Sequence, residues 1–318
     1  DIVVEKEIPI ENGFRKMYIN SGAIDSEGYE LQVKLSPLST RAWSWTVNFT
    51  AAYMKDILKR SYTDEPALER FTNGNAALDG FPVSGFWSIP FIGLSPKNGA
   101  PLFAVMDQVG GEMQKVSGSL LDYLVYSGDS EPRVSGGIST TVRYKRFTLN
   151  AMFNYQLGHY KRLNPFITSS NNGMLSIPGA DMNASTELLT RWQQPGDETH
   201  TRIPALSTRD EDVSQYLPDN SLSLGNYGAV YRYSLYNRST ERVVSASHLR
   251  CNRISLNYQT RISRITEINL GITVTNPFII KNRRLGDQDP EVMSMNADSY
   301  TPTMKRQQNY SISAEFIF

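Results

Sequence analysis

The sequence predicts an all-β fold of antiparallel transmembrane β-barrel strands, and three observations carry this prediction. Seven segments alternate apolar and polar residues with the period of two that is typical of a strand. Several of them reach the roughly nine to eleven residues that a membrane strand needs, whereas strands of soluble proteins usually have about five or six. Short connections alternate with very long ones, as they do in membrane β-barrels.

The alternation defines each strand in turn. In one segment, for example, Phe147, Leu149 and Ala151 alternate with Thr148 and Asn150. The polar faces contain Asn, Gln, Thr and Ser more often than Lys and Glu, which fits a hydrated channel. The predicted strands cover residues 29–35, 42–51, 138–144, 147–157, 253–262, 267–274 and 310–318.

The connections between these strands differ greatly in length. Residues 36–40, 144–146 and 261–264 form short turns, whereas 54–135, 159–247 and 276–308 are long, polar stretches that contain Gly and Pro. Compact soluble domains seldom have such loops. We expect further strands inside them at residues 85–92 and 227–236. We also expect a short helix at 184–192, with Leu188 and Trp192 four residues apart and Asn183 or Ser185 as its cap.

The last strand ends the sequence on bulky apolar residues. Its polar face carries Ser311, Ser313 and Glu315, and Ile317 is the exception on that face. We expect the chain to reach the periplasmic side at its last residue, which places residues 276–308 outside and the turn at 261–264 inside. The apolar face contains Tyr310, Ile312, Ala314, Phe316 and Phe318.

Composition excludes several classes of protein. The chain has 318 residues, with 32 basic and 32 acidic side chains, and this balance gives no electrostatic argument for a nucleic-acid partner. The mean hydropathy is −0.39, and no apolar run approaches the length of a membrane-spanning helix. The 17 tyrosines suit a membrane interface. Cys251 is the only cysteine, so no internal disulfide can form. The chain begins at Asp1 without Met, so we expect a mature or truncated product.

No motif indicates an enzyme, a metal site or a cofactor. The three histidines, His159, His200 and His248, lack ligand-type spacing. Neither G-x-x-x-x-G-K-[ST] nor G-x-S-x-G occurs. We interpret the acidic groups at 210–212 and 287–291 as solvated loop charge, although such clusters can in principle bind a hard cation. Cys251 is interpreted as a passive small residue on the polar face of its strand.

Four aromatic residues are candidates for contacts with a ligand. Trp87, Trp192, Tyr227 and Tyr231 lie in or beside the long connections, where their rings could stack on sugars or on side chains of a ligand. The alternative is that they pack the loops together or form part of a membrane girdle.

Six motifs follow one another along the chain. They are the N-x-G-x-I-type segment at 19–31, the strand entry G-D-S-E-P-R-V-S-G-G at 128–137, R-W-Q-Q-P-G-D at 191–197, the strand motif at 247–258, D-P-E at 289–291 and the terminal strand. Together they resemble the C-terminal part of the barrel of SusC/RagA-type TonB-linked outer-membrane proteins. Cys251 departs from the leucine that is usual in this family, a difference that we read as neutral.

The resemblance implies a function in nutrient uptake and a set of partners. The complete protein would be a barrel of roughly 22 strands with a plug in its lumen, in the outer membrane of a Gram-negative bacterium. It would import oligosaccharides or peptides with a SusD-like surface lipoprotein as its lid, which the four aromatic residues could contact. TonB would supply energy through an N-terminal region that has no counterpart in residues 1–318, and neither do the plug and the earlier strands. Residues 1–318 would then be the C-terminal portion of a TonB-dependent outer-membrane β-barrel.

The terminal strand resembles the signal that the barrel-assembly machinery recognises. The residues that carry this likeness are Tyr310, Ile312, Phe316 and Phe318. An alternative is that Phe318 simply anchors the strand at the periplasmic interface.

Two other interpretations remain open from the sequence. A self-contained passive porin of about ten to twelve strands would need neither plug nor TonB. A soluble secreted β-sandwich or adhesin would also contain about seven strands with alternating faces.

Overall fold

The fold was analysed in a computed structural model of the chain. The structure describes residues 15–60, 68–104 (except 77), 124–165, 185–206, 229–262, 267–292 and 306–317, together with residues 2–7, 9, 11, 13, 108–109, 112–113, 121, 168–169, 175–176 and 221–223.

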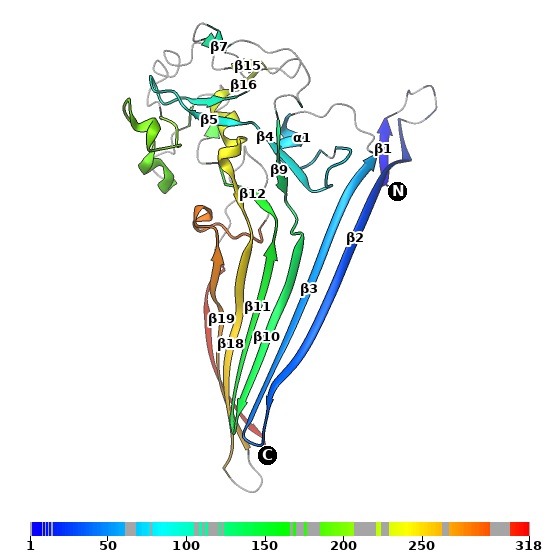
Figure 1. The fold of residues 1–318 in the computed structure, drawn as a ribbon, viewed down its shortest axis with the longest axis vertical. Helices are drawn as coiled ribbons and strands as arrows, with labels where there is room; N and C mark the ends of the chain where they lie inside the picture. Colours follow the sequence, from blue (N-terminus) through cyan, green and yellow to red (C-terminus); the bar gives the residue numbers. More distant parts are fainter. Residues whose placement is uncertain are drawn as a thin grey trace.

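One antiparallel sheet of eight strands is the largest element of the fold (Figure 1). Each strand pairs with its neighbours in chain order, in the order β1-β2-β3-β10-β11-β18-β19-β20. All seven predicted strands are present, and β1 is an additional one. The strands are β1 (Ile2–Glu7), β2 (Lys16–Ser39), β3 (Trp43–Arg60), β10 (Val134–Tyr144), β11 (Phe147–Leu157), β18 (His248–Arg261), β19 (Glu267–Lys281) and β20 (Asn309–Ile317).

The long connections gather at one end of this sheet and the short turns lie at the other (Figure 1). The first long connection contains α1 (Leu68–Thr72), β4 (Gly85–Ser88), β5 (Phe91–Leu94), β6 (Pro101–Phe103), β7 (Gln108–Val109), β8 (Glu112–Met113) and β9 (Val125–Asp129). The second contains β12 (Tyr160–Arg162), β13 (Thr168–Ser169), β14 (Leu175–Ser176), η3 (Thr186–Thr190), η4 (Asp197–Thr199), β15 (Ser221–Ser223), β16 (Ala229–Tyr231), α3 (Arg232–Asn237), η5 (Thr240–Arg242) and β17 (Val243–Ser245). The third contains η6 (Arg283–Leu285).

Three expectations for these connections need correction. The strand expected at 85–92 is two short strands, β4 and β5, because Pro90 between them has no N–H with which to continue a ladder. In the described part of 227–236, where a single strand is expected, β16 is followed by the helix α3, whose Leu235 and Tyr236 are fully buried. The expected short helix is the 3-10 helix η3, capped by Ser185 as predicted, and it ends before Trp192.

The register of the sheet sorts side chains into alternating rows. Six aligned residues form an apolar row: Trp45, Val142, Leu149, Leu256, Ile272 and Ile312. The next row is polar: Thr46, Thr141, Asn150, Ser255, Thr273 and Ser311. Within the polar row, Thr141 Oγ1 lies 2.8 Å from Asn150 Oδ1. We call the apolar side the outer face and the polar side the inner face of the sheet.

Aromatic residues mark two levels on the outer face. Trp43, Tyr144, Phe147 and Tyr258 occupy one row near the short turns, with ring centroids 4.2 Å apart for Trp43 and Tyr144. Near the loop end, the stacked rings of Tyr29 and Tyr53 are 6.3 Å apart. From Trp43 to Tyr53, β3 rises about 33 Å, which is about 25 Å along a barrel axis at a strand tilt of about 40°. This height matches the apolar band of a membrane barrel.

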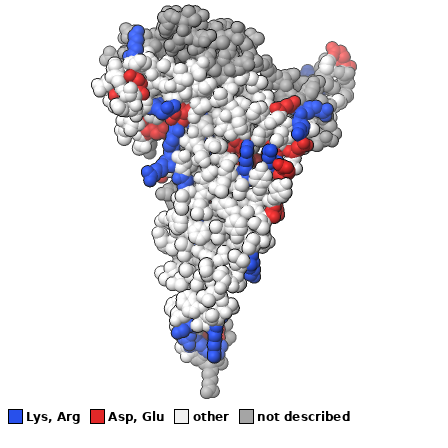
Figure 2. Space-filling model, viewed as in Figure 1, with Lys and Arg blue, Asp and Glu red and all other residues white. Residues whose placement is uncertain are grey.

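Charge is distributed in agreement with these two levels. Just above Tyr29 and Tyr53, Lys59 pairs with Asp25 at 3.2 Å, and Lys55 stands opposite Glu27. Between the two aromatic levels, the face of the molecule seen in Figure 2 is almost free of charged side chains. Exposed apolar residues occupy the outer rows there, with Ile312 reaching 86 % exposure. Among the described residues, no helix is long and apolar enough to cross a membrane.

A β-bulge in β18 corrects the expected place of Cys251. Arg253 pairs with Met152 and Cys251 with Phe153, so Asn252 has no partner opposite it in β11. The extra residue moves Cys251 to the parity of the outer face, where it is buried. At the same level of β19, Asn276 has a φ of 52°, a conformation that Asn tolerates, and Pro277 follows it.

Two neighbouring glycines in β10 allow a test of this packing. A Cβ on Gly136 would lie 2.0 Å from the Thr50 carbonyl oxygen and 2.5 Å from the Tyr155 hydroxyl, which donates to that same oxygen. A Cβ on Gly137 would lie 3.4 Å from its nearest neighbour, the Phe153 carbonyl oxygen. We predict that Gly136→Ala destabilises the sheet by roughly 1–3 kcal/mol through overpacking, whereas Gly137→Ala has a much smaller effect. Denaturant unfolding of both variants in detergent measures the difference, and equal stabilities would contradict it.

Candidate functional site

The described parts of the three long connections form what we call the loop assembly, and its core joins the first and second of them. Trp87 meets Phe71 edge to face at 5.6 Å, and Phe91 meets Tyr236 in the same way at 5.6 Å. The assembly therefore has a hydrophobic core of its own. The buried residues of this core are Phe71, Ala76, Trp87, Ile89, Phe91, Leu94, Ala100, Phe103, Trp192, Leu235 and Tyr236.

The structure buries two of the four candidate aromatic residues, Trp87 and Trp192. Trp87 and Trp192 are 3 % and 9 % exposed and belong to the core of the loop assembly. Trp192 also donates from Nε1 to Glu198 Oε2 at 3.1 Å. Tyr231 ends β16, and Tyr227 lies outside the described residues. Packing thus accounts for the position of the two tryptophans, and ligand contact stays a prediction.

Arg162 of β12 is the polar centre of the loop assembly. Its side chain is 1 % exposed and donates to five acceptors that come from the first two connections. These are the carbonyl oxygens of Thr72 at 3.1 Å, Trp87 at 3.0 Å, Asn237 at 3.4 Å and Ser239 at 3.2 Å, and Ser88 Oγ at 3.0 Å. Burial lowers the pKa of Arg162 to about 9, and the nearby charges of Arg238 and Arg242 lower it further. Neutral dipoles therefore hold a buried guanidinium in place.

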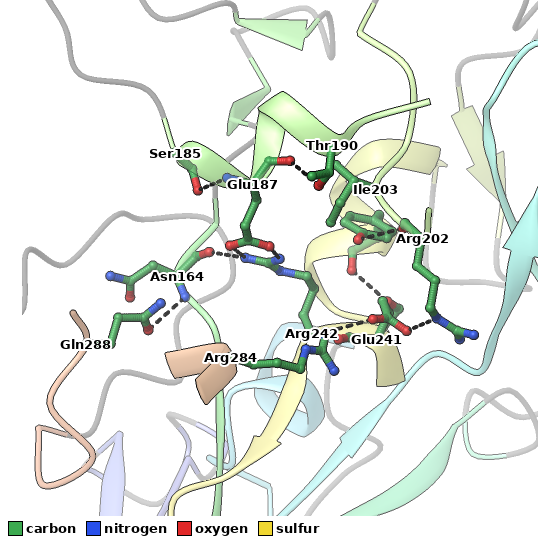
Figure 3. A network of polar contacts seen from close by, with 12 residues as sticks. Asn164, Ser185, Glu187, Thr190, Arg202, Ile203, Glu241, Arg242, Arg284 and Gln288 are labelled. Carbon is green, nitrogen blue, oxygen red and sulfur yellow. Dashed lines mark hydrogen bonds and ion pairs between the residues drawn. The ribbon is translucent and has the colours of Figure 1, made fainter. Parts of the chain in front are cut away.

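A second polar network connects the second and third connections (Figure 3). Glu241 of η5 lies between Arg202 and Arg284, and Arg284 Nη2 donates to its Oε1 at 2.7 Å. The fully buried Arg242 pairs with Glu187 of η3 and donates to the Asn164 carbonyl at 2.7 Å. These contacts fix η3, η5 and η6 relative to one another.

A third cluster attaches the last connection to the inner face of the large sheet. Arg250 of β18 donates from Nη2 to Asp289 Oδ1 at 2.6 Å and from Nε to Glu291 Oε1 at 2.9 Å. Arg306 and Asn154 also contact Glu291, at 2.5 and 2.8 Å. Burial raises the pKa of Glu291, but these hydrogen bonds and positive charges outweigh burial and hold it at about 2.

This cluster corrects the interpretation as solvated loop charge for Asp289 and Glu291, whereas Asp287 is exposed as expected. Asp289 is only 3 % exposed, and its carboxylate and that of Glu291 bind arginines instead of water. The acidic group at 210–212 lies outside the described residues. Among the residues that the structure describes, no group of His, Cys, Asp and Glu could hold a metal ion.

Sequence reasoning also missed a pair of buried histidines. His159 follows β11 and His248 begins the neighbouring strand β18, which brings their ring centroids to 6.0 Å. His248 contacts the Ala246 carbonyl at 2.9 Å and Glu291 at 3.2 Å. The His159 ring is 1 % exposed and has no hydrogen-bond partner among the described residues. The signal in the sequence is that both histidines stand at adjoining ends of two strands that pair with each other.

The surroundings of His159 favour its neutral form. Burial lowers the pKa of His159 to about 4, and the charges of His248 and Lys161 add to this effect. Burial also lowers the pKa of Lys161 to about 8, although Asp289 opposes the shift. Lys161 donates to the carbonyl oxygens of Asp289 at 3.0 Å and Val292 at 2.7 Å.

Loss of Arg162 should loosen the loop assembly while leaving the sheet intact. We predict that Arg162→Ala costs about 3 kcal/mol or more, because five acceptors lose their donor inside a core. Hydrogen exchange should become faster in β4, β12 and α3 and stay slow in β10 and β11. Arg202→Gln is the matched control, because this half-exposed ion pair contributes at most about 1 kcal/mol. Unchanged exchange in Arg162→Ala would contradict this role.

The low pKa of His159 predicts a pH dependence of the stability around β12. The unfolded chain binds a proton at this histidine below about pH 6.5, but the folded protein does so only near pH 4. Stability should therefore fall as the pH decreases from 6.5 towards 4, by about 1.4 kcal/mol per unit from this residue. Both His159→Gln and His159→Leu should remove this contribution, measured by hydrogen exchange of β12 and β17 from pH 7 to pH 5. A parent-like slope in both variants would exclude the assignment.

Comparisons with known proteins support the fold. No protein-family model matches the sequence, and no curated protein matches it. Among solved structures, the RagAB peptide importer in its "closed-closed" state is 16 % identical with a TM-score of 0.64, over 100 % of this chain and 32 % of that one. In its "open-open" state the values are 17 %, 0.66, 100 % and 31 %.

The chain thus spans about a third of the length of the structures that it matches. At such low identity, the likeness is one of fold. It confirms, at this level, the resemblance to SusC/RagA-type transporters that the sequence motifs indicate. The chain therefore has the fold of part of the barrel of an outer-membrane transporter of this type.

Proposed function

We propose that residues 1–318 are the C-terminal portion of a TonB-dependent outer-membrane transporter that imports oligosaccharides or peptides. The observation that supports this best is the large sheet itself, which would form the wall of the barrel. Its outer face is apolar between two aromatic levels about 25 Å apart, its inner face is polar, and a structured loop assembly stands at one end. A membrane barrel with outer loops has these features.

The unpaired edges of the sheet favour a barrel that contains more strands than these eight. From Ala23 to Ser39, the edge of β2 that faces away from β3 has no partner among the described residues. At the other end of the sheet, β20 pairs with β19 alone among these residues. Each unpaired backbone group in hydrocarbon costs several kcal/mol. Strands and a plug outside residues 1–318 would complete a closed barrel of roughly 22 strands.

The proposed partners follow from this arrangement. A SusD-like surface lipoprotein would cover the loop assembly, and TonB would act through an N-terminal region outside residues 1–318. The barrel-assembly machinery would recognise the outer face of β20 at Tyr310, Ile312 and Phe316, followed by Phe318, which lies outside the described residues. Contacts of Trp87, Trp192, Tyr227 and Tyr231 with a ligand or the lid would require the two tryptophans to leave the loop core.

The two alternatives differ in how well they fit. A soluble sandwich buries its apolar face against a second sheet, whereas the outer rows here are exposed, with Ile272 54 % and Leu31 56 % accessible. A passive porin would have the same wall, and its transport would not depend on TonB.

Placing an arginine on each face tests the membrane-spanning wall. Val274 lies on the outer face midway between the aromatic levels, and the neighbouring Thr273 lies on the inner face. We predict that Val274→Arg costs about 2–4 kcal/mol in the complete protein folded into lipid vesicles, because the charge would face hydrocarbon. Thr273→Arg should have little effect. Equal costs for the two variants would contradict this orientation.

Energy coupling separates an active transporter from a porin. Cells that carry the complete protein should take up an oligosaccharide or peptide ligand only when TonB is functional. Equal uptake with and without TonB would favour the passive porin.

A further inference from the structure

Positive charge predominates on the inner face between the two aromatic levels. Lys34, Arg143 and Arg253 point to this face, each from a different strand. The only carboxylate on this face of the described strands between these levels is Glu30, in the uppermost row. The whole chain is electrically balanced, with 32 basic and 32 acidic residues. The excess of cations is therefore a property of this face and not of the composition.

All three side chains are exposed, and none forms an ion pair among the residues that the structure describes. Arg253 Nη2 lies 3.6 Å from Met152 Sδ. Lys34 and Arg253 share one row, four strand spacings or about 19 Å apart, and Arg143 lies about 13 Å nearer the short turns. We call these three residues the cationic wall.

The same face shows which groups its cations bind. Directly above Arg253 on β18, Arg250 and His248 contact the carboxylates of Asp289 and Glu291. These acids come from the third connection, which reaches onto the inner face at this level. The cations at the top are thus neutralised by the protein's own carboxylates, and those of the cationic wall are not.

We propose that the cationic wall binds carboxylate groups of the imported ligand, so that the transporter prefers acidic peptides or acidic oligosaccharides to neutral ones. This inference rests on the proposed function and specifies its substrate class. A lumen with low-dielectric walls concentrates the field of unpaired charges and raises the local concentration of oppositely charged solutes. An ion pair in a hydrated site changes affinity by about fivefold.

The experiment compares matched probes in cells that carry the complete protein. One pair is a hexapeptide with three glutamates and the same peptide with three glutamines. The other pair is trigalacturonate and its fully methyl-esterified form, which tells an acidic sugar from an acidic peptide. The test variant combines Lys34→Gln, Arg143→Gln and Arg253→Gln. The control combines Lys55→Gln and Lys59→Gln, which remove two cations from the outer face above the aromatic level.

The parent should prefer the acidic member of at least one pair. In the test variant this preference should fall at least tenfold, with uptake of the neutral member unchanged, and the control should behave like the parent. An equal preference in parent and test variant would overturn the inference, whereas TonB-dependent uptake of the neutral probe would still support the proposed function. A test variant that loses thermal stability and takes up both members equally poorly would also overturn it, because the cations would then pair with protein carboxylates. Absence of any TonB-dependent uptake by the parent would overturn both.

Discussion

The register of the seven long strands determines which side chains lie on each face of the wall. Because side chains alternate, a slip of one residue would exchange the two faces. The register is continuous from β3 to β20 near the short turns, and the bulge at Asn252 interrupts it only near the loops. The aromatic rows, the apolar outer rows and the cationic wall all follow from this one alignment.

The loop assembly is stabilised by a different set of interactions. Its hydrophobic core is small, and buried cations connect segments that are distant in sequence. Arg162 holds backbone carbonyls of the first two connections, and Arg250 holds carboxylates of the third. Because hydrogen bonds to charged groups are stronger than neutral ones, a few guanidinium groups can fix long polar segments. They also attach these segments to the inner face of the wall.

The sequence could predict the membrane-level strands because their alternation is local. It could not predict β1 or the upper half of β2, where charged and polar residues occur on both faces, as at Ser26 and Glu27. The buried state of Asp289 and Glu291 depends on Arg250 and Arg306, which no local pattern connects with them. The outer parity of Cys251 depends on a bulge that alternation alone does not show. Long-range pairing thus decides the parts that sequence patterns missed.

The central claim is that residues 1–318 complete their hydrogen bonding as part of one larger closed barrel. A structure of the complete protein in a lipid bilayer tests this most directly. We predict that an upstream strand pairs with the free edge of β2 at membrane level, that another pairs with β20, and that the apolar outer rows face lipid. A complete protein in which both edges remain unpaired, or in which residues 1–318 lie outside the bilayer, would contradict this claim.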